Sequence, residues 1–151
     1  MLDDVSELLL DRTRCSVAGT LAVVGEKWSL LVLREAFLGV RRFADFQRIL
    51  GAPRAVLTDR LATLVDQGIL RRVPYQAEGE RQRHEYRLTQ KGIDLYPTLV
   101  ALMEWGDRYL ADGGGAMELH HRECGAPVHL TLACEDGHTL SGAREVTPIP
   151  R

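Results

Sequence analysis

The chain has 151 residues, of which 45% are hydrophobic, and a net charge of −2, which suits one domain with a sizeable core and at most a small appendage. Its three cysteines form no dense framework and no basic-then-apolar leader opens the chain, so we expect a reducing, cytoplasmic environment. No apolar run approaches the roughly 20 residues that cross a bilayer, and we expect no membrane span.

Two helices are predicted at the N-terminal end. The first, within residues 1–13, has apolar positions but little local core to meet, and such a terminal helix often packs on a partner subunit. The second spans residues 17–24, with Ser16 as its N-cap and Gly25 at its end. Cys15 lies just before it, where a helix N-terminus favours the thiolate. The alternative for Cys15 is a small buried apolar side chain.

A central helix is predicted from residue 26 to about residue 38. Its apolar residues, Trp28 among them, are too widely distributed for a one-sided stripe, so we expect it to be buried on several sides. Gly39 ends it. A short amphipathic helix over residues 43–50 follows, and a turn at Gly51 and Ala52 closes that helix.

The helix predicted over residues 53–68 carries an apolar stripe, begins at a proline and stops at a glycine, which suits the two ends of a helix. The stripe consists of Leu57, Leu61, Leu64 and Val65. At about 100° per residue, a second flank lies roughly a quarter-turn away and is short-chained apart from one arginine. That flank consists of Arg54, Ala55, Thr58 and Ala62. With the preceding helix and turn, this helix forms a helix-turn-helix.

A β-hairpin is predicted after this helix, because the hydrophobic period changes towards two. Its strands cover residues 69–75 and 83–88, and its turn at residues 76–80 contains a glycine. A helix followed by such a wing is a DNA-docking arrangement, whereas the plain alternative is a core helix with an ordinary hairpin. The predicted fold class is therefore mainly α with a small β-wing, a winged helix-turn-helix.

Positive charge gathers in the same part of the chain. Residues 41–87 contain ten arginines against six acidic residues, a local charge of +4, which leaves −6 for the rest. The guanidinium fork matches phosphate oxygens, so this excess favours contact with nucleic acid over chance clustering on a solvated surface.

A long helix is predicted from Thr89, its cap, to about residue 111. Pro97 removes one backbone hydrogen bond, and we expect a kink near residues 93–97. The helix has two apolar sides, which need two partners: the domain core and a second subunit. One side consists of Leu95, Leu99, Leu102 and Tyr109, and the other of Ile93, Tyr96, Val100 and Met103.

The linker-like stretch at residues 112–115 separates two predicted domains: a DNA-binding and dimerisation domain over residues 1–111 and a small β-rich extension over residues 116–151. In the extension, two short motifs could supply four tetrahedral zinc ligands. These ligands are His121, Cys124, Cys134 and His138. The alternative is a metal-free β-hairpin built from Val128, Leu130 and Leu132 with a turn at residues 135–137. No other cofactor is expected.

These residues resemble the HxlR-type winged-helix transcriptional regulators, which are relatives of the MarR regulators. The resemblance covers about residues 13–110 and is carried by Cys15 and by residues 25–33, 42–46, 57–61, 68–70, 85–92 and 104–106. It implies a homodimer that places each recognition helix in a major groove of double-stranded DNA, at a palindromic operator. The chain departs from the family at Pro53, where a small polar residue is common. It also departs at Gly137, where ribbon extensions on some of these regulators carry a second cysteine.

The resemblance and the charge suggest roles for individual residues. Arg54 is the candidate for reading guanine, and Ala55 and Thr58, with Ala62, would permit close approach to the bases. The arginines of the wing would contact the minor groove and the others would hold phosphates. The wing residues are Arg81 and Arg83, and the phosphate-binding residues are Arg41, Arg42 and Arg72. Redox-sensing members of the resembled family use an N-terminal cysteine, which makes Cys15 a candidate sensor.

We therefore expect a sequence-specific DNA-binding regulator, a repressor, that responds to a small molecule or an oxidant. The rival interpretation is a winged-helix module that binds proteins without DNA. An enzyme is not expected, because the chain has no Gly-rich phosphate loop, nucleophile elbow or paired-carboxylate constellation in a matching context.

Overall fold

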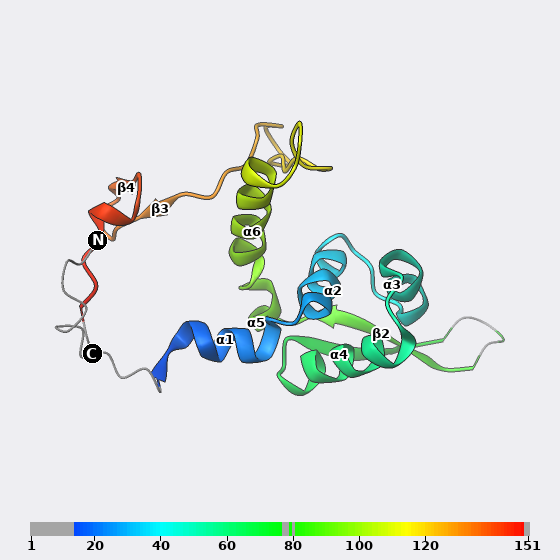
Figure 1. Ribbon diagram of the computed structural model, residues 1–151. Coiled ribbons are helices and arrows are strands. Elements are labelled where there is room, and N and C mark those ends of the chain that lie inside the picture. Colours follow the sequence, from blue (N-terminus) through cyan, green and yellow to red (C-terminus); the bar gives the residue numbers. More distant parts are fainter. Residues whose placement is uncertain (1–13, 77–78, 80, 150–151) are drawn as a thin grey trace. The chain divides into compact units, whose positions relative to one another are not determined.

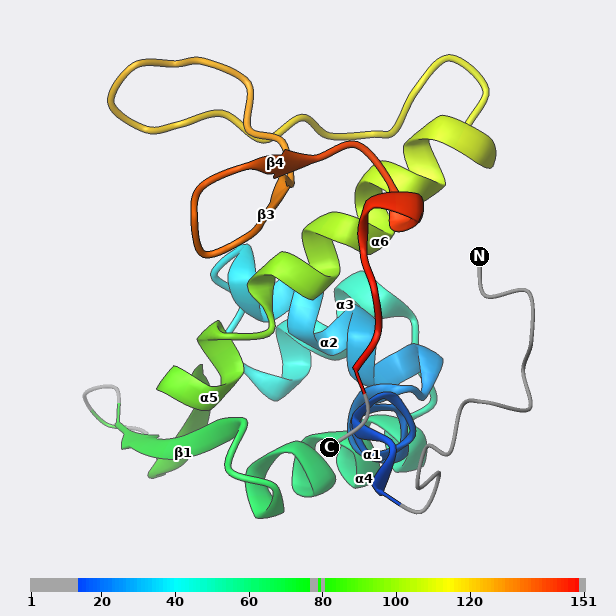
Figure 2. The same cartoon turned by 90° about the vertical axis from the view of Figure 1, so that its left-hand side faces the viewer.

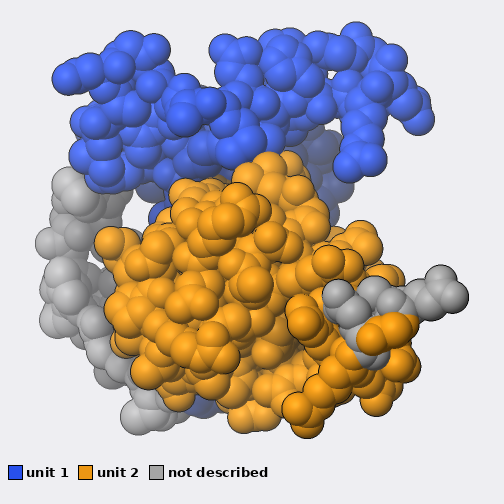
Figure 3. Space-filling view, turned by 90° about the vertical axis from the view of Figure 1, so that its right-hand side faces the viewer, with its two compact units in different colours: residues 1–15, 100–151 blue, residues 16–99 orange. Residues whose placement is uncertain are grey.

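The computed structural model describes residues 14–76, 79 and 81–149 (Figure 1). The helix predicted within residues 1–13 lies outside the described residues, as does most of the predicted wing turn. Contacts divide the chain into two compact units (Figure 3). The first unit comprises residues 16–99, which are orange and labelled unit 2 in Figure 3, and the second contains described residues 14–15 and 100–149, which are blue and labelled unit 1. The predicted domain boundary at residues 112–115 stays a prediction.

The first unit is mainly helical and carries one β-hairpin. Its elements are α1 (Ser16–Val24), α2 (Lys27–Phe37), α3 (Phe43–Leu50), α4 (Arg54–Asp66), β1 (Leu70–Tyr75), β2 (Arg83–Leu88) and α5 (Gln90–Ile93). Helix α6 (Tyr96–Tyr109) begins in this unit and continues into the second. This order confirms the predicted winged helix-turn-helix, with α3 and α4 as its two helices and β1–β2 as its wing.

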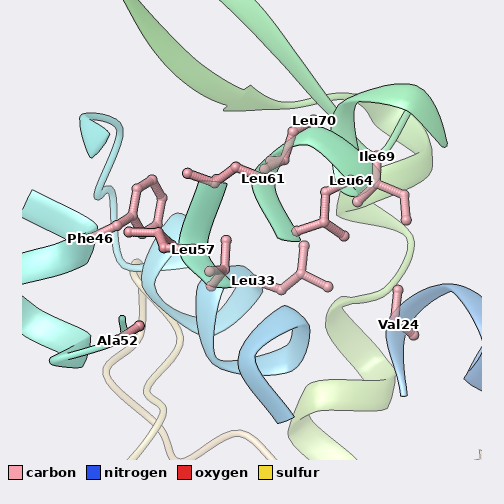
Figure 4. Packing of buried hydrophobic residues seen from close by; sticks show 10 residues of the cluster. Val24, Leu33, Phe46, Ala52, Leu57, Leu61, Leu64, Ile69 and Leu70 are labelled. Carbon is pink, nitrogen blue, oxygen red and sulfur yellow. The ribbon is translucent and has the colours of Figure 1, made fainter. Parts of the chain in front are cut away.

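The core of the first unit forms where α4 meets α2 and α3. Three residues of the predicted stripe of α4 are fully buried, namely Leu57, Leu61 and Leu64 (Figure 4). Val32 and Leu33 of α2 and Phe46 of α3 are also fully buried. Helix α2 is thus central, as its scattered apolar residues predict. This packing fixes the face of α4 that stays outside.

The C-terminal end of α4 sets the start of the wing. Gly68 has a φ of +68°, the Gly68 N–H donates to the Val65 carbonyl at 2.9 Å and the Ile69 N–H donates to the Leu64 carbonyl at 2.9 Å. This pair of bonds is a Schellman motif, in which glycine avoids the strain that a side chain would meet. It turns the chain so that Ile69 and Leu70 enter the core.

Strands β1 and β2 form an antiparallel hairpin that projects beyond the helices in Figure 1. Its register runs from Leu70 opposite Leu88 to Tyr75 opposite Arg83. The apolar pair lies at the core end of the hairpin and the polar pair lies at the tip end. The Tyr86 N–H also donates to the Arg41 carbonyl at 2.8 Å, which attaches β2 to the segment before α3.

The long helix predicted after Thr89 is two helices, so that prediction was wrong in extent. The Thr89 hydroxyl accepts from the Gly92 N–H at 3.2 Å, which confirms the predicted cap, but α5 ends at Ile93 and α6 starts at Tyr96. Pro97 is the second residue of α6. The N–H groups of the first helical turn have no acceptor within the helix, so a proline there removes no helical hydrogen bond. The expected kink is thus a break.

One of the two predicted apolar sides of this helix is only partly buried in the single chain, and the predicted contact with a second subunit stays a prediction. Leu95 and Leu99 pack against the core of the first unit. Leu102 and Tyr109, expected on the same side, are 50% and 63% exposed. Within the first unit, the part of this side that packs against the core therefore ends at Leu99.

The second unit has little regular structure after α6 (Figure 2). Strands β3 (Leu132–Ala133) and β4 (Thr139–Leu140) pair in antiparallel register, and a 3₁₀ turn, η3 (Ala143–Glu145), follows. None of the described residues from 101 to 149 is buried. The predicted hairpin exists around residues 135–137, but Val128 and Leu130 lie outside its strands, because no core faces them.

Among the described residues no helix alone has the length and apolarity of a membrane span; α1 and α2 reach these only as a pair bent by 78°.

Candidate nucleic-acid interface

The N-terminal end of α4 is open to a ligand. Pro53 precedes the first helical residue with φ −55° and ψ 136°, and no side chain caps the helix there. The backbone N–H groups of a first turn have no partner within the helix, and the helix dipole favours negative charge beside them. Such an end is suited to a phosphate.

The predicted short-chained flank of α4 faces outward. Arg54, Ala55 and Thr58 are exposed and Ala62 is half-buried. The Thr58 hydroxyl donates to the Arg54 carbonyl at 2.8 Å, so its hydrogen is already used and the side chain offers a methyl group and an acceptor. The flank can therefore approach a groove closely, with Arg54 as its long donor.

The guanidinium of Arg54 has a partner on the neighbouring helix. Its Cζ lies 5.0 Å from the ring centre of Phe43, the first residue of α3, and this distance is within cation–π range. Phe43 therefore holds Arg54 near the start of α4 while the side chain stays exposed. The sequence places the two residues eleven positions apart and gives no sign of this pairing.

A second arginine is held between α3 and the wing. Arg42 Cζ lies 4.6 Å from the ring centre of Tyr75 in β1, and Arg42 Nε lies 3.7 Å from Glu85 Oε1 in β2. The other carboxylate oxygen of Glu85 lies 3.2 Å from Arg87 Nη2. The Glu85 side chain is only 13% exposed, so one shielded carboxylate orients two arginines.

Residues 41–43 thus connect the recognition helix to the wing. Arg41 bonds β2 through its carbonyl, Arg42 contacts both wing strands, and Phe43 contacts Arg54 of α4. The side chains of Arg41 and Arg42 remain exposed. Two of the three predicted phosphate-binding residues, Arg41 and Arg42, therefore lie on the segment that joins α4 to the wing.

The remaining predicted residues lie on the wing. Arg72 of β1 is exposed, with its Cζ 5.9 Å from the ring centre of Tyr86 on the paired strand. Arg83 begins β2, and Arg81 precedes it outside the strand; both are exposed. Sequence reasoning missed Phe43, Tyr75 and Glu85. Their interleaving with arginines was visible, but the pairing across elements was not.

Cys15 is exposed immediately before α1, rather than buried as the apolar alternative required.

The first unit contains a cavity of about 320 Å³ between α1, the start of the wing and α5. It is lined by Ser16, Gly19, Thr20, Val23, Val24, Ile69, Lys91 and Leu95. The Lys91 ammonium donates to the Gln67 carbonyl at 2.7 Å.

The four predicted zinc ligands form two separate pairs. Cys124 Sγ lies 3.2 Å from His121 Nδ1, and Cys134 Sγ lies 3.4 Å from His138 Nδ1. Among the described residues, one group of three potential metal ligands has its ligand atoms within 4.8 Å of one another. The group consists of Cys134, Asp136 and His138. The structure therefore forms each predicted pair but does not bring the two pairs together.

The neighbouring His120 has both ring nitrogens in use. Nδ1 lies 2.8 Å from the Gly125 carbonyl and Nε2 lies 3.1 Å from a carboxylate oxygen of Glu118. The Gly125 hydrogen bond and then the Glu118 hydrogen bond raise the pKa of His120 above its usual value. His120 is thus committed to these acceptors.

Comparisons with known proteins agree with this geometry. The sequence profile of the HxlR-like helix-turn-helix family matches residues 23–113. Rv3095 of Mycobacterium tuberculosis, named an uncharacterized HTH-type transcriptional regulator, is 48% identical over 136 residues, covering 89% of this chain and 85% of its own. A regulator of Synechocystis, sll1512, is 36% identical over 97 residues, covering 64% of this chain and 70% of its own.

Solved structures of transcription regulators are also similar to this chain. The crystal structure of PA1607, a candidate transcription factor, has a TM-score of 0.80 and 39% identity, covering 91% of this chain and 96% of that chain. The reduced form of HypR, described as a redox regulator, has a TM-score of 0.56 and 33% identity, covering 62% of this chain and 92% of that chain.

Proposed function

Because this chain belongs to the HxlR-like helix-turn-helix family of transcriptional regulators, we propose that it is a sequence-specific repressor that binds a palindromic operator as a homodimer. The observation that supports this most is the exposed, short-chained flank of α4 beside arginines that are held by α3 and the wing. The family and the relatives above are named as regulators and not as enzymes. The DNA partner of this chain would be chromosomal, so we expect the protein to act in the cytoplasm.

In this proposal α4 enters the major groove. Arg54 leaves or extends from Phe43 to donate to O6 and N7 of a guanine, while Ala55 and Thr58 lie against the bases. The open first turn of α4, with Arg41, Arg42 and Arg72, binds phosphates on either side of the groove. Arg81 and Arg83 of the wing contact the adjacent minor groove, where they read its width more than its bases.

The test is selection of bound sequences from random DNA, followed by affinity measurements on the selected operator and a scrambled duplex. Arg54→Ala should lose about 1–3 kcal/mol of discrimination for one base position. Arg83→Ala should weaken binding to both duplexes alike and reduce the slope of log affinity against log salt by about one. Arg144→Ala, in η3 of the second unit, is the matched control and should change neither.

Equal losses on operator and scrambled DNA for Arg54→Ala would contradict the readout role. The absence of any salt-sensitive shift with selected DNA would favour the rival interpretation, a winged-helix module that binds proteins. The two outcomes are separable because the first keeps DNA binding and the second does not.

The dimer is proposed from exposed apolar side chains on α6. Leu102, Trp105 and Tyr109 are 50%, 57% and 63% exposed, and Trp105 and Tyr109 have ring centres 5.5 Å apart. A second copy of the chain would cover them and would set the half-site spacing on DNA. Sedimentation equilibrium should give a dimer that Leu102→Glu converts to a monomer, whereas Arg144→Glu should leave it intact.

The response to a signal is proposed from two features of the N-terminal end. The 320 Å³ cavity beside α1 has the size of a small ligand site, and a compound bound there would bias the position of α1. Exposed Cys15 suits an oxidant, as does the similarity to the redox regulator HypR. Mild diamide treatment should change operator affinity in the native protein but not in Cys15→Ser.

A further inference from the structure

The tail after α6 forms two hydrogen-bonded turns, but its described residues form no buried core. None of its described residues is buried, and Leu132 and Val146 are 63% and 52% exposed. Even so, the backbone forms two closed turns. Small units that cannot bury a core are usually stapled by disulfides or by a metal. The described tail cysteines, Cys124 and Cys134, are exposed and not joined in a disulfide, so both thiols are available as metal ligands.

The first turn is held by a short backbone ladder. The His121 N–H donates to the Ala126 carbonyl at 2.9 Å, and the Gly125 N–H donates to the His121 carbonyl at 2.8 Å. Gly125 has a φ of +70°, a conformation that favours glycine. These bonds bring His121 Nδ1 and Cys124 Sγ to 3.2 Å from each other.

The second turn repeats the arrangement between β3 and β4. The Cys134 N–H donates to the His138 carbonyl at 3.0 Å, the Gly137 N–H donates to the Cys134 carbonyl at 2.9 Å, and Gly137 has a φ of +83°. Cys134 Sγ and His138 Nδ1 are 3.4 Å apart. Gly137, which breaks the two-cysteine pattern of a ribbon, therefore lies in the turn that brings His138 Nδ1 beside Cys134 Sγ.

Both sulfur-to-nitrogen distances suit one metal. Zinc bonds of about 2.3 Å to sulfur and 2.0–2.1 Å to nitrogen, at a tetrahedral angle, place the two ligand atoms about 3.6 Å apart. The observed 3.2 and 3.4 Å are close to this value in each turn. Two ligands per turn and two turns make the four positions that a structural zinc site fills.

We propose that His121, Cys124, Cys134 and His138 bind one Zn²⁺ per chain and that the ion draws the two turns together into a closed tail. The turns are separate in the structure, joined by an extended segment (Figure 1). Nine residues lie between Cys124 and Cys134, which is ample chain for the closure. Binding converts two thiols to thiolates and releases two protons to solvent, so the bound site with neutral histidines has no net charge.

The test uses the full-length protein stripped with a chelator and titrated with Zn²⁺ or Co²⁺. We expect one metal per chain, a tetrahedral cobalt spectrum with a thiolate-to-cobalt charge-transfer band, and protection of residues 113–149 from protease when zinc is present. Cys124→Ser and Cys134→Ser should each weaken zinc binding by more than about 100-fold, since even outer-shell changes cost 10–100-fold. Cys15→Ser should retain one zinc per chain.

Three results would overturn the proposal. The first is a native protein that binds no zinc after reconstitution, and this holds whether or not any variant folds. The second is loss of zinc in Asp136→Asn with retention in Cys124→Ser, which would assign the metal to the hairpin group alone. The third is one zinc per two chains with concentration-dependent binding, which would place it between chains.

Discussion

Different interactions stabilise the inside of each of the two units. In the first unit, ten hydrophobic residues from α1 to β1 are buried in one cluster, and this cluster includes the eight largest fully buried hydrophobic side chains among the described residues. In the second, none of the described residues after Val100 is buried. Apolar packing therefore does most to hold α4 and the start of the wing in place, whereas the tail depends on turns and local hydrogen bonds.

This difference follows from what each segment has to bury. Leu57, Leu61 and Leu64 recur at helical spacing, so one side of α4 is apolar and needs a partner surface. In the tail, Val128, Leu130 and Leu132 alternate with other residues, but β3 has only two residues. A strand of that length is too short to form an apolar sheet face. The position of α4 is thus determined by many apolar contacts, whereas the described residues of the tail have no buried core.

The largest effect that would test this comparison is removal of a leucine from each unit. Leu61→Ala opens a cavity in the packed core and should lower the free energy of unfolding by about 2–5 kcal/mol. Leu132→Ala removes a side chain that is 63% exposed and should cost less than about 0.5 kcal/mol. Urea unfolding followed by helical circular dichroism measures both. Equal losses would mean that the tail is packed like the core.

A glycine substitution in each unit gives the next largest contrast. A Cβ on Gly92 would lie 2.3 Å from the Ile69 carbonyl oxygen, a backbone atom that already accepts from the Thr89 N–H. Gly92→Ala should therefore destabilise the first unit by about 1–3 kcal/mol. A Cβ on Gly106 of α6 meets nothing within 4 Å, and Gly106→Ala should raise stability by up to about 1 kcal/mol because alanine is the better helix former. Thermal unfolding of both variants checks the opposite signs.

These contrasts also show how far sequence alone could go. The limits of α4, its apolar stripe and the stop at Gly68 were predictable, because each depends on neighbours within one turn of a helix. Thr89 likewise marked the start of α5, and Pro97 indicated a disturbance close to the start of α6. The sequence did not indicate that the proline would separate two helices, since this depends on where the core ends.

The candidate interface was predicted residue by residue but not as an arrangement. Arg42 and Arg54 were chosen for their charge and their place in a helix-turn-helix. Their partners come from elements that are distant in sequence: Glu85 from the second strand of the wing and Phe43 from the preceding helix. Pairing of this kind is set by the fold, and no spacing in the chain shows it.

Removing one carboxylate charge from each unit compares the shielded Glu85, which lies between two arginines, with Glu104, whose Oε1 accepts one backbone hydrogen bond and lies 3.8 Å from Nδ1 of the exposed His129. Glu85→Gln leaves Arg42 and Arg87 without their shared, mostly shielded carboxylate and should cost about 1 kcal/mol, the upper part of the range for partly exposed pairs. Glu104 Oε1 accepts from the Leu130 N–H at 2.7 Å, and a glutamine oxygen can do the same. Glu104→Gln should therefore change stability by less than about 0.5 kcal/mol. High salt should reduce the Glu85→Gln difference, and a difference that persists in high salt would show that packing rather than charge is involved.

The last comparison concerns a buried hydroxyl of the first unit that has no hydrogen-bond partner among the described residues. Ser29 of α2 is fully buried, and its hydroxyl has no hydrogen-bond partner among the described residues. Removing an unsatisfied buried hydroxyl and replacing serine by a better helix former both favour the folded state, so Ser29→Ala should raise the free energy of unfolding by about 1 kcal/mol. The Ser141 hydroxyl in the tail instead donates to Glu145, and Ser141→Ala should have no effect or a slight loss. Denaturant titrations of the two variants give the comparison, and a destabilised Ser29→Ala would mean that the hydroxyl has a partner such as a bound water.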